Sequence, residues 1–390
     1  MDYDVAVIGG GIHGVGVAQA AAIRGYKTIL IEQYSDLAQG TSSRSSKLIH
    51  GGLRYLEQYQ FSLVRECLLE RSYLLKNAPD LVTLKPIYIP VYKDSKRPSW
   101  MIYVGLSMYA LLGNLASDAR FKIVPKNKWS QLHNLNKDNL QAVFQYYEAQ
   151  TNDRLLTHAV MNSAQEHGAE LMLNTNVSSI NLLNNHNLIT CETNTGTTKK
   201  ISSTTVINAA GPWAARVLDK VQPKQEKIAV DLVQGTHIVL PLQLGDIIFY
   251  LESPDDKRPL FVMPWYGNTL VGTTESLFTQ EPSSTTPLKE EVEYLLRAFS
   301  HHFPAFKQEQ LKIKHQFSGL RVLPSGANNS NQRSRETIYL RDRKIKPRLL
   351  SIFGGKLTTY RATSEKVIIY LQESLPKQQP YTETKYLKLE

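Results

Sequence analysis

The chain has 390 residues, a length typical of two or three domains. Hydrophobic residues make up 42% and charged residues 21% of it, which excludes a disordered, collagen-like or coiled-coil protein. Lys and Arg number 45 against 35 Asp and Glu, and the net charge of +10 favours an anionic partner: a phosphorylated small molecule, nucleic acid or an anionic membrane surface. Cys67 and Cys191 are too few for a disulfide framework or metal cluster, so we expect a reducing compartment.

An apolar stretch without charged residues covers 98–117, directly after Lys96 and Arg97. Three interpretations remain open: a membrane-spanning helix, a buried helix, or a helix lying in the membrane interface. The serines, Asn114 and Pro98 argue against a membrane span, whereas the Trp, the Tyr residues and the basic flank suit the interface. No basic segment or long apolar run precedes a cleavage site at the N-terminus, so we expect no secretory signal.

The first elements form one βαβ unit: a strand at 3–8, a helix at 12–25 and a strand at 27–31. In the middle of the chain we expect helices at 62–77, 98–116 and 155–167, and strands at 86–92, 169–174, 177–183, 187–193 and 204–208. A strand-rich region follows, with strands at 228–233, 237–240, 247–251, 260–263 and 270–272. The remaining pattern predicts a helix at 287–303, a polar loop at 327–334, a strand at 349–353, a closing helix at 357–374 and a frayed polar tail.

This order predicts an α/β protein with interleaved domains. A nucleotide-binding domain is assembled from residues 1–85, 150–215 and 345–375. A substrate domain built on a mostly antiparallel sheet is inserted as residues 86–149 and 216–344, and 376–390 form the polar tail.

A glycine loop, Gly9-x-Gly11-x-x-Gly14, lies between the first strand and helix, and Glu32 ends the second strand. This context is typical of dinucleotide binding. Gly9 permits the tight turn, Gly11 lets the backbone approach a pyrophosphate, and Gly14 lets the helix pack on the sheet. Glu32 can accept hydrogen bonds from ribose hydroxyls. A glycine-rich turn without a ligand is the alternative.

A polar segment distinguishes FAD from NAD, which share this loop. Thr41–Lys47 contains five hydroxyl groups and two cations, and His50–Tyr55 follows. Such a cluster suits the second phosphate and the ribityl chain of a flavin, although a solvated serine-rich loop has the same composition.

Several motifs together resemble the FAD-dependent (aerobic, respiratory) glycerol-3-phosphate dehydrogenases of the glycine oxidase-like flavoenzyme group. The matching stretches fall in order along the chain: Val7–Gly14, Thr41–Glu57, Pro98–Ile102, Val206–Trp213, Gly235–Val239, Met263–Trp265, Val271–Thr274, Ser318–Arg321 and Phe353–Arg361. Two departures stand out. Members continue beyond the closing helix with a helical cap, which we expect this chain, ending at Glu390, to lack; and Arg321–Pro324 differs slightly from the family pattern.

The resemblance implies a Rossmann-like FAD-binding domain of the glutathione reductase type with an inserted antiparallel substrate domain. It implies FAD as cofactor and oxidation of sn-glycerol 3-phosphate to dihydroxyacetone phosphate, with electrons passing to a membrane quinone. We therefore expect a cytoplasmic protein associated peripherally with the inner face of the cytoplasmic membrane, and a homodimer is left open. A flavin oxidase of this or another small anion, using oxygen, is the alternative.

The substrate phosphate calls for arginines, whose planar fork binds oxyanions with two hydrogen bonds. Arg54 and Arg321 lie in matched motifs, and Arg335 follows the polar loop. Arg321 could instead form a structural salt bridge, and Arg335 could belong to a solvated basic face.

The hydroxyl proton calls for a base, for which we choose His237, since an imidazole titrates near the operating pH; a hydrogen-bonded core histidine is the alternative. Tyr55 and Thr274 are candidate substrate partners. Gly354–Thr358 opens the closing helix, whose N–H groups can face the flavin N1–C2=O edge, and Lys356 adds a charge. The predicted catalytic set is His237, Arg54, Arg321, Lys356 and Tyr55, and the substrate-binding set is Arg54, Tyr55, His237, Thr274, Arg321 and Arg335.

The cofactor-binding residues that we predict are Gly9, Gly11, Ile12, His13, Gly14, Glu32, Thr41, Ser42, Ser43, Ser46, Lys47, Leu48, His50, Gly51, Gly52, Val177, Ala210, Gly211, Trp213, Gly354, Gly355, Lys356, Leu357 and Thr358. No metal site is expected, because the adjacent His301 and His302 cannot face one ion together. Basic motifs interleaved with aromatic residues are lacking, so we expect no nucleic acid partner. A flavoprotein without catalytic activity remains a further interpretation.

Overall fold

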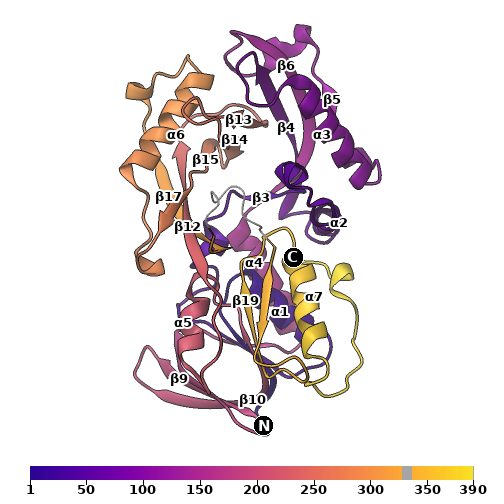
Figure 1. Cartoon of the computed structure of the whole chain (residues 1–390), viewed down its shortest axis with the longest axis vertical. Helices are drawn as coiled ribbons and strands as arrows, with labels where there is room; N and C mark the ends of the chain where they lie inside the picture. Colours follow the sequence, from indigo (N-terminus) through magenta and orange to yellow (C-terminus); the bar gives the residue numbers. More distant parts are fainter. Residues whose placement is uncertain (327–335, 390) are drawn as a thin grey trace.

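A computed structural model describes residues 1–326 and 336–389. The chain forms two lobes stacked along the long axis of the molecule, each built around one sheet (Figure 1). The predicted α/β class is confirmed. The chain passes between the two lobes several times, which brings segments far apart in sequence to the junction.

The first sheet has nine strands within the described residues. Its order is β11 (Val221–Gln222), β8 (Thr175–Leu182), β9 (Asn187–Thr193), β10 (Thr198–Asn208), β1 (Tyr3–Ile8), β2 (Thr28–Ile31) and β7 (Glu170–Met172), with β19 (Leu349–Phe353) paired to β10 and β18 (Ile338–Arg341) to β19. The strands around β1 are parallel, whereas β8, β9 and β10 are antiparallel. This parallel centre corresponds to the part of the chain that the glycine loop predicted to bind a nucleotide.

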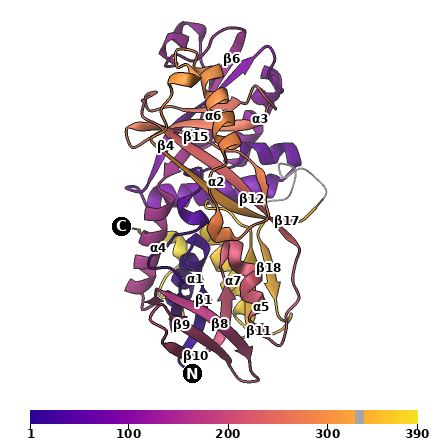
Figure 2. The ribbon, with the colours of Figure 1, turned by 90° about the vertical axis from the view of Figure 1, so that its left-hand side faces the viewer.

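Helices cover the parallel part of this sheet. α1 (Ile12–Ala22) packs against α4 (Asp153–Glu166) and α7 (Tyr360–Leu371), and the three lie together in the lower lobe (Figure 2). The short α5 (Ala214–Asp219) follows the turn η5 (Gly211–Trp213). Every residue of α1 except His13 is buried, because its glycines and alanines are small enough to let α4 and α7 approach closely.

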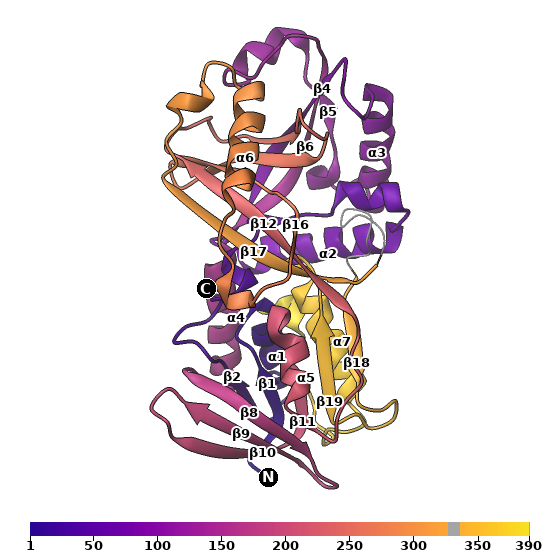
Figure 3. The ribbon, with the colours of Figure 1, turned by 60° about the vertical axis from the view of Figure 1, so that its left-hand side comes forward.

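The second sheet has ten strands in the part of the chain described. Its order is β16 (Ser276–Phe278), β12 (Val230–Leu240), β15 (Asn268–Gly272), β14 (Pro259–Trp265), β13 (Ile248–Glu252), β4 (Val82–Tyr92), β6 (Leu140–Thr151) and β3 (Leu48–Ile49), with β17 (His315–Pro324) paired to β12 and β5 (Lys122–Ile123) to β6. The pairs are antiparallel except β4 with β13. The long strands β12 and β17 run side by side toward the lower lobe (Figure 3).

Three helices accompany the second sheet: α2 (Phe61–Asn77), α3 (Ser99–Leu112) and α6 (Lys289–His302). α6 packs on β12 and β15. α3 buries Ile102, Leu106, Tyr109 and Ala110 but leaves an apolar outer face exposed, so it is half-buried rather than fully buried. Among the described residues, no helix combines the length and the apolar character needed to span a membrane.

Some predicted boundaries differ. The stretches 228–233 and 237–240 belong to the single strand β12. The long strands β6 and β17 and the short strands β3, β5, β11, β16 and β18 were not predicted. α7 begins at Tyr360 rather than 357, because a turn comes first, in which the amide of Thr359 donates to the carbonyl of Lys356 (3.2 Å). The predicted loop at 327–334 lies outside the described residues. The helices and strands that the sequence predicted are present.

The domain limits differ at short strands. β11 and β18 fall within the predicted substrate domain, yet they hydrogen-bond to β8 and β19 of the first sheet. Conversely, β3 falls within the predicted nucleotide-binding domain but pairs with β6 of the second sheet. A short strand has too few residues for its sequence pattern to indicate which strand it pairs with.

The predicted frayed tail is wrong for the residues described. The amide of Tyr381 donates to the carbonyl of Ile23 (2.8 Å), and that of Leu389 donates to the carbonyl of Asn77 (2.7 Å). Leu389 is buried in the core of the lower lobe. One buried leucine and a few backbone hydrogen bonds therefore hold a segment whose composition is polar.

Candidate active site

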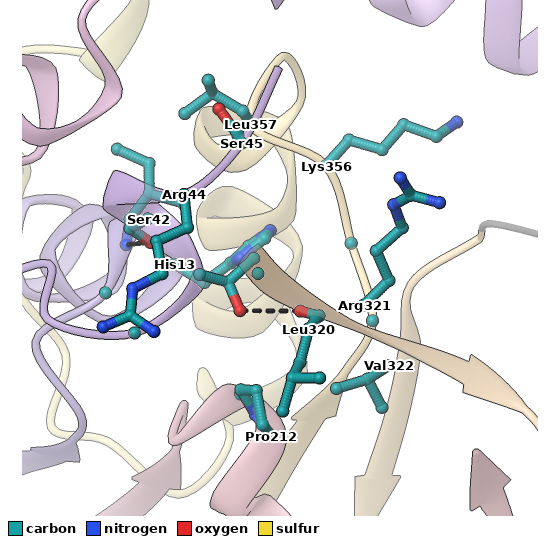
Figure 4. A pocket seen from close by; sticks show the side chains of 18 of the residues that line it. His13, Ser42, Arg44, Ser45, Pro212, Leu320, Arg321, Val322, Lys356 and Leu357 are labelled. Atoms are coloured by element: carbon teal, nitrogen blue, oxygen red, sulfur yellow. Dashed lines mark hydrogen bonds between the residues drawn. The ribbon is translucent and has the colours of Figure 1, made fainter. Parts of the chain in front are cut away.

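A cavity of about 680 Å³ lies at the junction of the two lobes. It extends from the glycine loop after β1, along Thr41–Ser46, to the loop Gly354–Thr358 and the strands β12 and β17. Figure 4 shows Arg321 and Lys356 on one side of it, and His13, Ser42 and Arg44 on the other. The cavity therefore has a dinucleotide end at β1 and a cationic end at the second sheet.

The glycine loop has the geometry that its spacing predicted. Gly9 has φ +107°, and a Cβ on Gly14 would lie 1.8 Å from the carbonyl oxygen of Gly9, so both positions require glycine. A Cβ on Gly11 would meet only the Oγ of Ser42, at 3.1 Å. Gly14 thus serves the packing of α1, whereas Gly11 leaves the N-terminus of α1 open to a ligand.

Glu32 lies at the end of β2, against the glycine loop. Its carboxylate accepts hydrogen bonds from the amides of Gly10 (2.5 Å) and Tyr34 (2.9 Å). Burial raises the pKa of Glu32, and these amide donors oppose that effect. A buried acid that lines the cavity at this place fits the predicted ribose contact.

The hydroxyl-rich segment ties the two lobes together. The Oγ of Ser42 accepts a hydrogen bond from the amide of Ile12 (2.9 Å), and the Oγ1 of Thr41 donates to the carbonyl of Leu320 (2.7 Å). The Oγ of Ser46 lies 3.0 Å from the Nε2 of His237. The segment therefore spans from α1 in the first lobe to β12 and β17 in the second.

His237 lies at the junction and lines the cavity with only 2% of its surface exposed. Burial holds its pKa well below the ordinary value, and the nearby charges of Arg321 and Lys47 lower it further. The expectation that this imidazole titrates near the operating pH is therefore wrong: the ring is neutral at neutral pH. A neutral ring can still accept a proton.

The predicted phosphate ligands differ in their surroundings. Arg321 donates from Nη1 to the Oε1 of Glu275 (2.7 Å) and from Nη2 to the Oγ1 of Thr273 (3.2 Å). Arg321 thus forms the structural salt bridge that was the alternative to a phosphate contact. It also lines the cavity, as Arg54 does. Arg335 lies outside the described residues.

The aromatic ring of Tyr55 contacts the loop Gly354–Thr358, which precedes α7. The Nζ of Lys356 lies 3.9 Å from the ring centroid of Tyr55, a cation–π contact, and both residues line the cavity. Two of the predicted catalytic residues are therefore in contact, although about three hundred positions separate them in the sequence.

Five predicted site residues lie behind the cavity wall. Thr274 donates its hydroxyl to Glu291 (2.8 Å) and accepts from the amide of Thr236 (2.9 Å), so it faces away from the cavity. The others are Gly14, which packs on Gly9; Ser43; Lys47, which pairs with the buried Asp153; and Gly51, whose amide bonds to Glu148 and Tyr109. Neighbouring residues point to opposite sides of an extended chain, which accounts for Thr274.

Other lining residues were not predicted. They are chiefly Gly10, Tyr34, Gln39, Arg44, Ser45, Tyr146, Asp153, Tyr250, Phe261, Thr273, Glu275 and Leu320. Arg44 and Ser45 stand in the hydroxyl-rich segment, and the alternation around Thr274 would have indicated Thr273 and Glu275. Tyr146, Tyr250 and Phe261 carry no local signal, because only the packing of the second sheet brings them to the site.

The described residues fit a flavin dinucleotide. Gly11 leaves the backbone open, Glu32 lines the cavity beside the glycine loop, and the buried Nε2 of His13 has no hydrogen-bond partner among the described residues. Burial also lowers the pKa of His13 to about 4, so the ring is neutral. Within the described ranges, no group of three or more His, Cys, Asp or Glu could hold a metal ion.

Residues 4–360 match the family model of the FAD dependent oxidoreductases. The chain belongs to this family. The flavoenzyme is 38% identical over 378 residues to a glycerol-3-phosphate dehydrogenase of Pseudomonas aeruginosa, covering 95% of this chain and 72% of the relative. It is 35% identical over 382 residues to a D-erythritol 1-phosphate dehydrogenase of Brucella abortus, covering 96% and 74%.

A solved structure agrees with the fold of this flavoenzyme. The glycerol-3-phosphate dehydrogenase of Bacillus halodurans, in complex with FAD, superposes with a TM-score of 0.79 at 27% identity, covering 100% of this chain and 68% of that one. FAD is the cofactor of this flavoenzyme, which confirms the expectation from the glycine loop and the hydroxyl-rich segment.

Proposed function

We propose that this flavoenzyme oxidises sn-glycerol 3-phosphate to dihydroxyacetone phosphate. The observation that carries the proposal is that Arg54, Arg321 and Lys356 line the FAD cavity together with the neutral base His237. Relatives named glycerol-3-phosphate dehydrogenase support it. The substrate is a small phosphorylated alcohol.

The phosphate is held by Arg321 and Arg54. Glu275 fixes the guanidinium of Arg321 through Nη1, so the fork is oriented before the substrate arrives. A charge-assisted hydrogen bond contributes on the order of 1.5–3 kcal/mol, enough to change binding roughly ten- to a hundredfold. The phosphate thereby places the secondary alcohol carbon near His237.

Bound FAD would supply the acceptor for the hydride of the alcohol carbon. The chain supplies position and charge: the backbone of Gly354–Thr358 and the ammonium group of Lys356 line the cavity beside Tyr55. His237 receives the hydroxyl proton, and its low pKa keeps it unprotonated and ready at neutral pH.

The polyol chain length is a second question, because a relative named D-erythritol 1-phosphate dehydrogenase is 35% identical. Both compounds share a phosphate and a secondary alcohol. Comparing kcat/KM for the two substrates decides which one the site prefers, and we expect the three-carbon compound.

Electrons leave the flavin to a membrane quinone in this proposal, and the enzyme sits peripherally on the inner face of the cytoplasmic membrane. The outer face of α3 supports it: Trp100 is 66% exposed and Leu111 63%, and the exposed Lys96 precedes the helix. Oxygen as acceptor is the alternative.

The decisive experiment is anaerobic mixing of the holoenzyme with sn-glycerol 3-phosphate while the flavin absorption band is followed. Bleaching is expected; an unbleached flavin contradicts the proposal and favours a non-catalytic flavoprotein. Reoxidation by a quinone analogue, without peroxide formation in air, would identify a dehydrogenase rather than an oxidase.

The membrane contact is tested with anionic vesicles. The double variant Trp100→Ser/Leu111→Ser should bind them less than wild type, whereas Leu277→Ser, which changes an equally exposed leucine on β16, should not differ. Equal binding by all three proteins contradicts the contact through α3.

A further inference from the structure

Ser46 and His237 form a hydroxyl–imidazole pair inside the cavity. The Oγ of Ser46 lies 3.0 Å from the Nε2 of His237, and both residues line the cavity. The other ring nitrogen, Nδ1, is buried without a hydrogen-bond partner among the described residues. Among the described residues, Ser46 is thus the hydrogen-bond partner of this imidazole.

The imidazole has little room to turn. Its ring stacks on Phe317 of β17 at a centroid distance of 5.0 Å and an angle of 12°. On β15, a Cβ on Gly272 would lie 2.2 Å from the Cδ2 of His237, so the ring lies directly against the glycine backbone. Contacts with two neighbouring strands therefore keep Nε2 directed at Ser46.

Ser46 is itself held from both sides by one buried carboxylate. Asp153 accepts hydrogen bonds from the amide (3.0 Å) and the hydroxyl (2.6 Å) of Ser45, and it pairs with the Nζ of Lys47 (2.6 Å). Because both neighbours are anchored, the backbone of Ser46 is fixed and its hydroxyl is presented to the cavity.

Burial holds the pKa of His237 well below its ordinary value, and the charges of Arg321 and Lys47 lower it further. Lys47 lies behind Phe317, with its Nζ 5.1 Å from the ring centroid, and is paired with Asp153; Arg321 of β17 is paired with Glu275. His315 of β17 contacts the same Phe317 ring at 6.0 Å. Glu291 of α6 binds Thr236 and Thr274 and so belongs to the opposite face of β12.

We propose that the Ser46 hydroxyl relays the proton of the substrate hydroxyl to the Nε2 of His237, an inference that rests on the proposed function. The substrate O–H bond breaks and a new O–H bond forms at Ser46, while the original Ser46 proton moves to Nε2. The electron pair of the substrate C–H bond leaves as hydride to FAD, so the alcohol becomes a ketone and the flavin is reduced. Ser46 thus has a proton-transfer role besides its predicted contact with the cofactor.

Ser46→Ala tests the relay, with Ser163→Ala as the matched control. Ser163, in α4, is a buried serine whose Oγ accepts a hydrogen bond of the same length, 3.0 Å, from Gln19. We expect Ser46→Ala to retain FAD, to lower kcat at least tenfold, to alter the acid limb of its pH profile and to change KM much less than kcat. Ser46→Thr, which keeps a hydroxyl, should recover most of the activity.

A second readout needs no turnover. In the flavin-free protein, the ¹⁵N resonance of Nε2 of His237, assigned with His237→Gln, should move in Ser46→Ala and stay in place in Ser163→Ala. Wild-type kcat and pH profile in Ser46→Ala would overturn the relay, and so would loss of bound FAD as its sole effect. Failure of the wild-type flavin to bleach would instead contradict the proposed function itself.

Discussion

The Nζ of Lys47 lies 2.6 Å from the Oδ1 of Asp153, and both side chains are buried, 5% and 0% exposed. This pair joins the start of α4 to the segment that carries Ser46. Its partners are 106 positions apart in the chain, and a lysine predicted to touch the cofactor proves to support the wall behind it.

Breaking this ion pair should lower the free energy of unfolding. Asp153→Ala leaves the Lys47 ammonium buried and uncompensated, and we expect a loss of about 3–5 kcal/mol in unfolding free energy. The double variant Lys47→Met/Asp153→Asn removes both charges and should recover part of that loss. Urea unfolding of the three proteins measures it, and equal stability of the single and double variants would contradict the interpretation.

Two glycines of the same loop should respond differently to substitution. Gly14→Ala places a methyl group 1.8 Å from the Gly9 carbonyl oxygen, so the loss of stability should reach or exceed about 1–3 kcal/mol. Gly11→Val has space apart from Ser42 and should fold but purify without yellow flavin. Thermal unfolding and the flavin absorbance separate the effects; a yellow Gly11→Val protein would count against the loop assignment.

Arg321→Ala should raise KM for sn-glycerol 3-phosphate roughly ten- to a hundredfold and leave FAD bound, because it removes a charged fork from the cationic end of the cavity. Arg297→Ala, on the exposed side of α6 and paired with Asp255, is the control and should behave as wild type. Loss of FAD without a change in KM would refute the phosphate role.

His302 gives a pH-dependent contribution to stability. Burial lowers its pKa to about 4 in the folded protein, while the unfolded value is about 6.5. The unfolded chain therefore binds the proton first, so stability falls as the pH drops from about 6.5 to about 4, by about 2 kcal/mol between pH 7 and pH 5.

His302→Gln keeps a donor for the carbonyl of Glu252 and should flatten this pH dependence, whereas His301→Gln, on the exposed neighbour, should not. Urea unfolding at pH 7 and pH 5 provides the measurement. An unchanged slope in His302→Gln would show that the group does not titrate as burial implies.

Both cysteines should be unreactive in the native protein. Burial raises the pKa of Cys67 to about 12 and that of Cys191 to about 11, so little thiolate exists at pH 8. A thiol reagent such as 5,5′-dithiobis(2-nitrobenzoate) should label neither in the folded enzyme and both after unfolding. Rapid labelling of the native protein would contradict this burial.

The sequence by itself determined the dinucleotide end of the site. Gly9, Gly11, Gly14 and Glu32 act within one βαβ unit of about thirty residues, and local spacing suffices because strand, turn and helix are neighbours in the chain. The resemblance added the motifs around Arg54, His237, Arg321 and Lys356, all of which line the cavity.

Tertiary structure alone decided which of these side chains meet. Thr274 binds Glu291, whereas Thr273 and Glu275 line the cavity. Ser46 contacts His237, which lies 191 positions away in the chain. The pairing of strands sets the side to which each residue points, and the packing of two sheets sets the distance between loops. A local stretch of sequence determines neither the direction of these side chains nor the distance between the loops, since both depend on contacts between segments far apart in the chain.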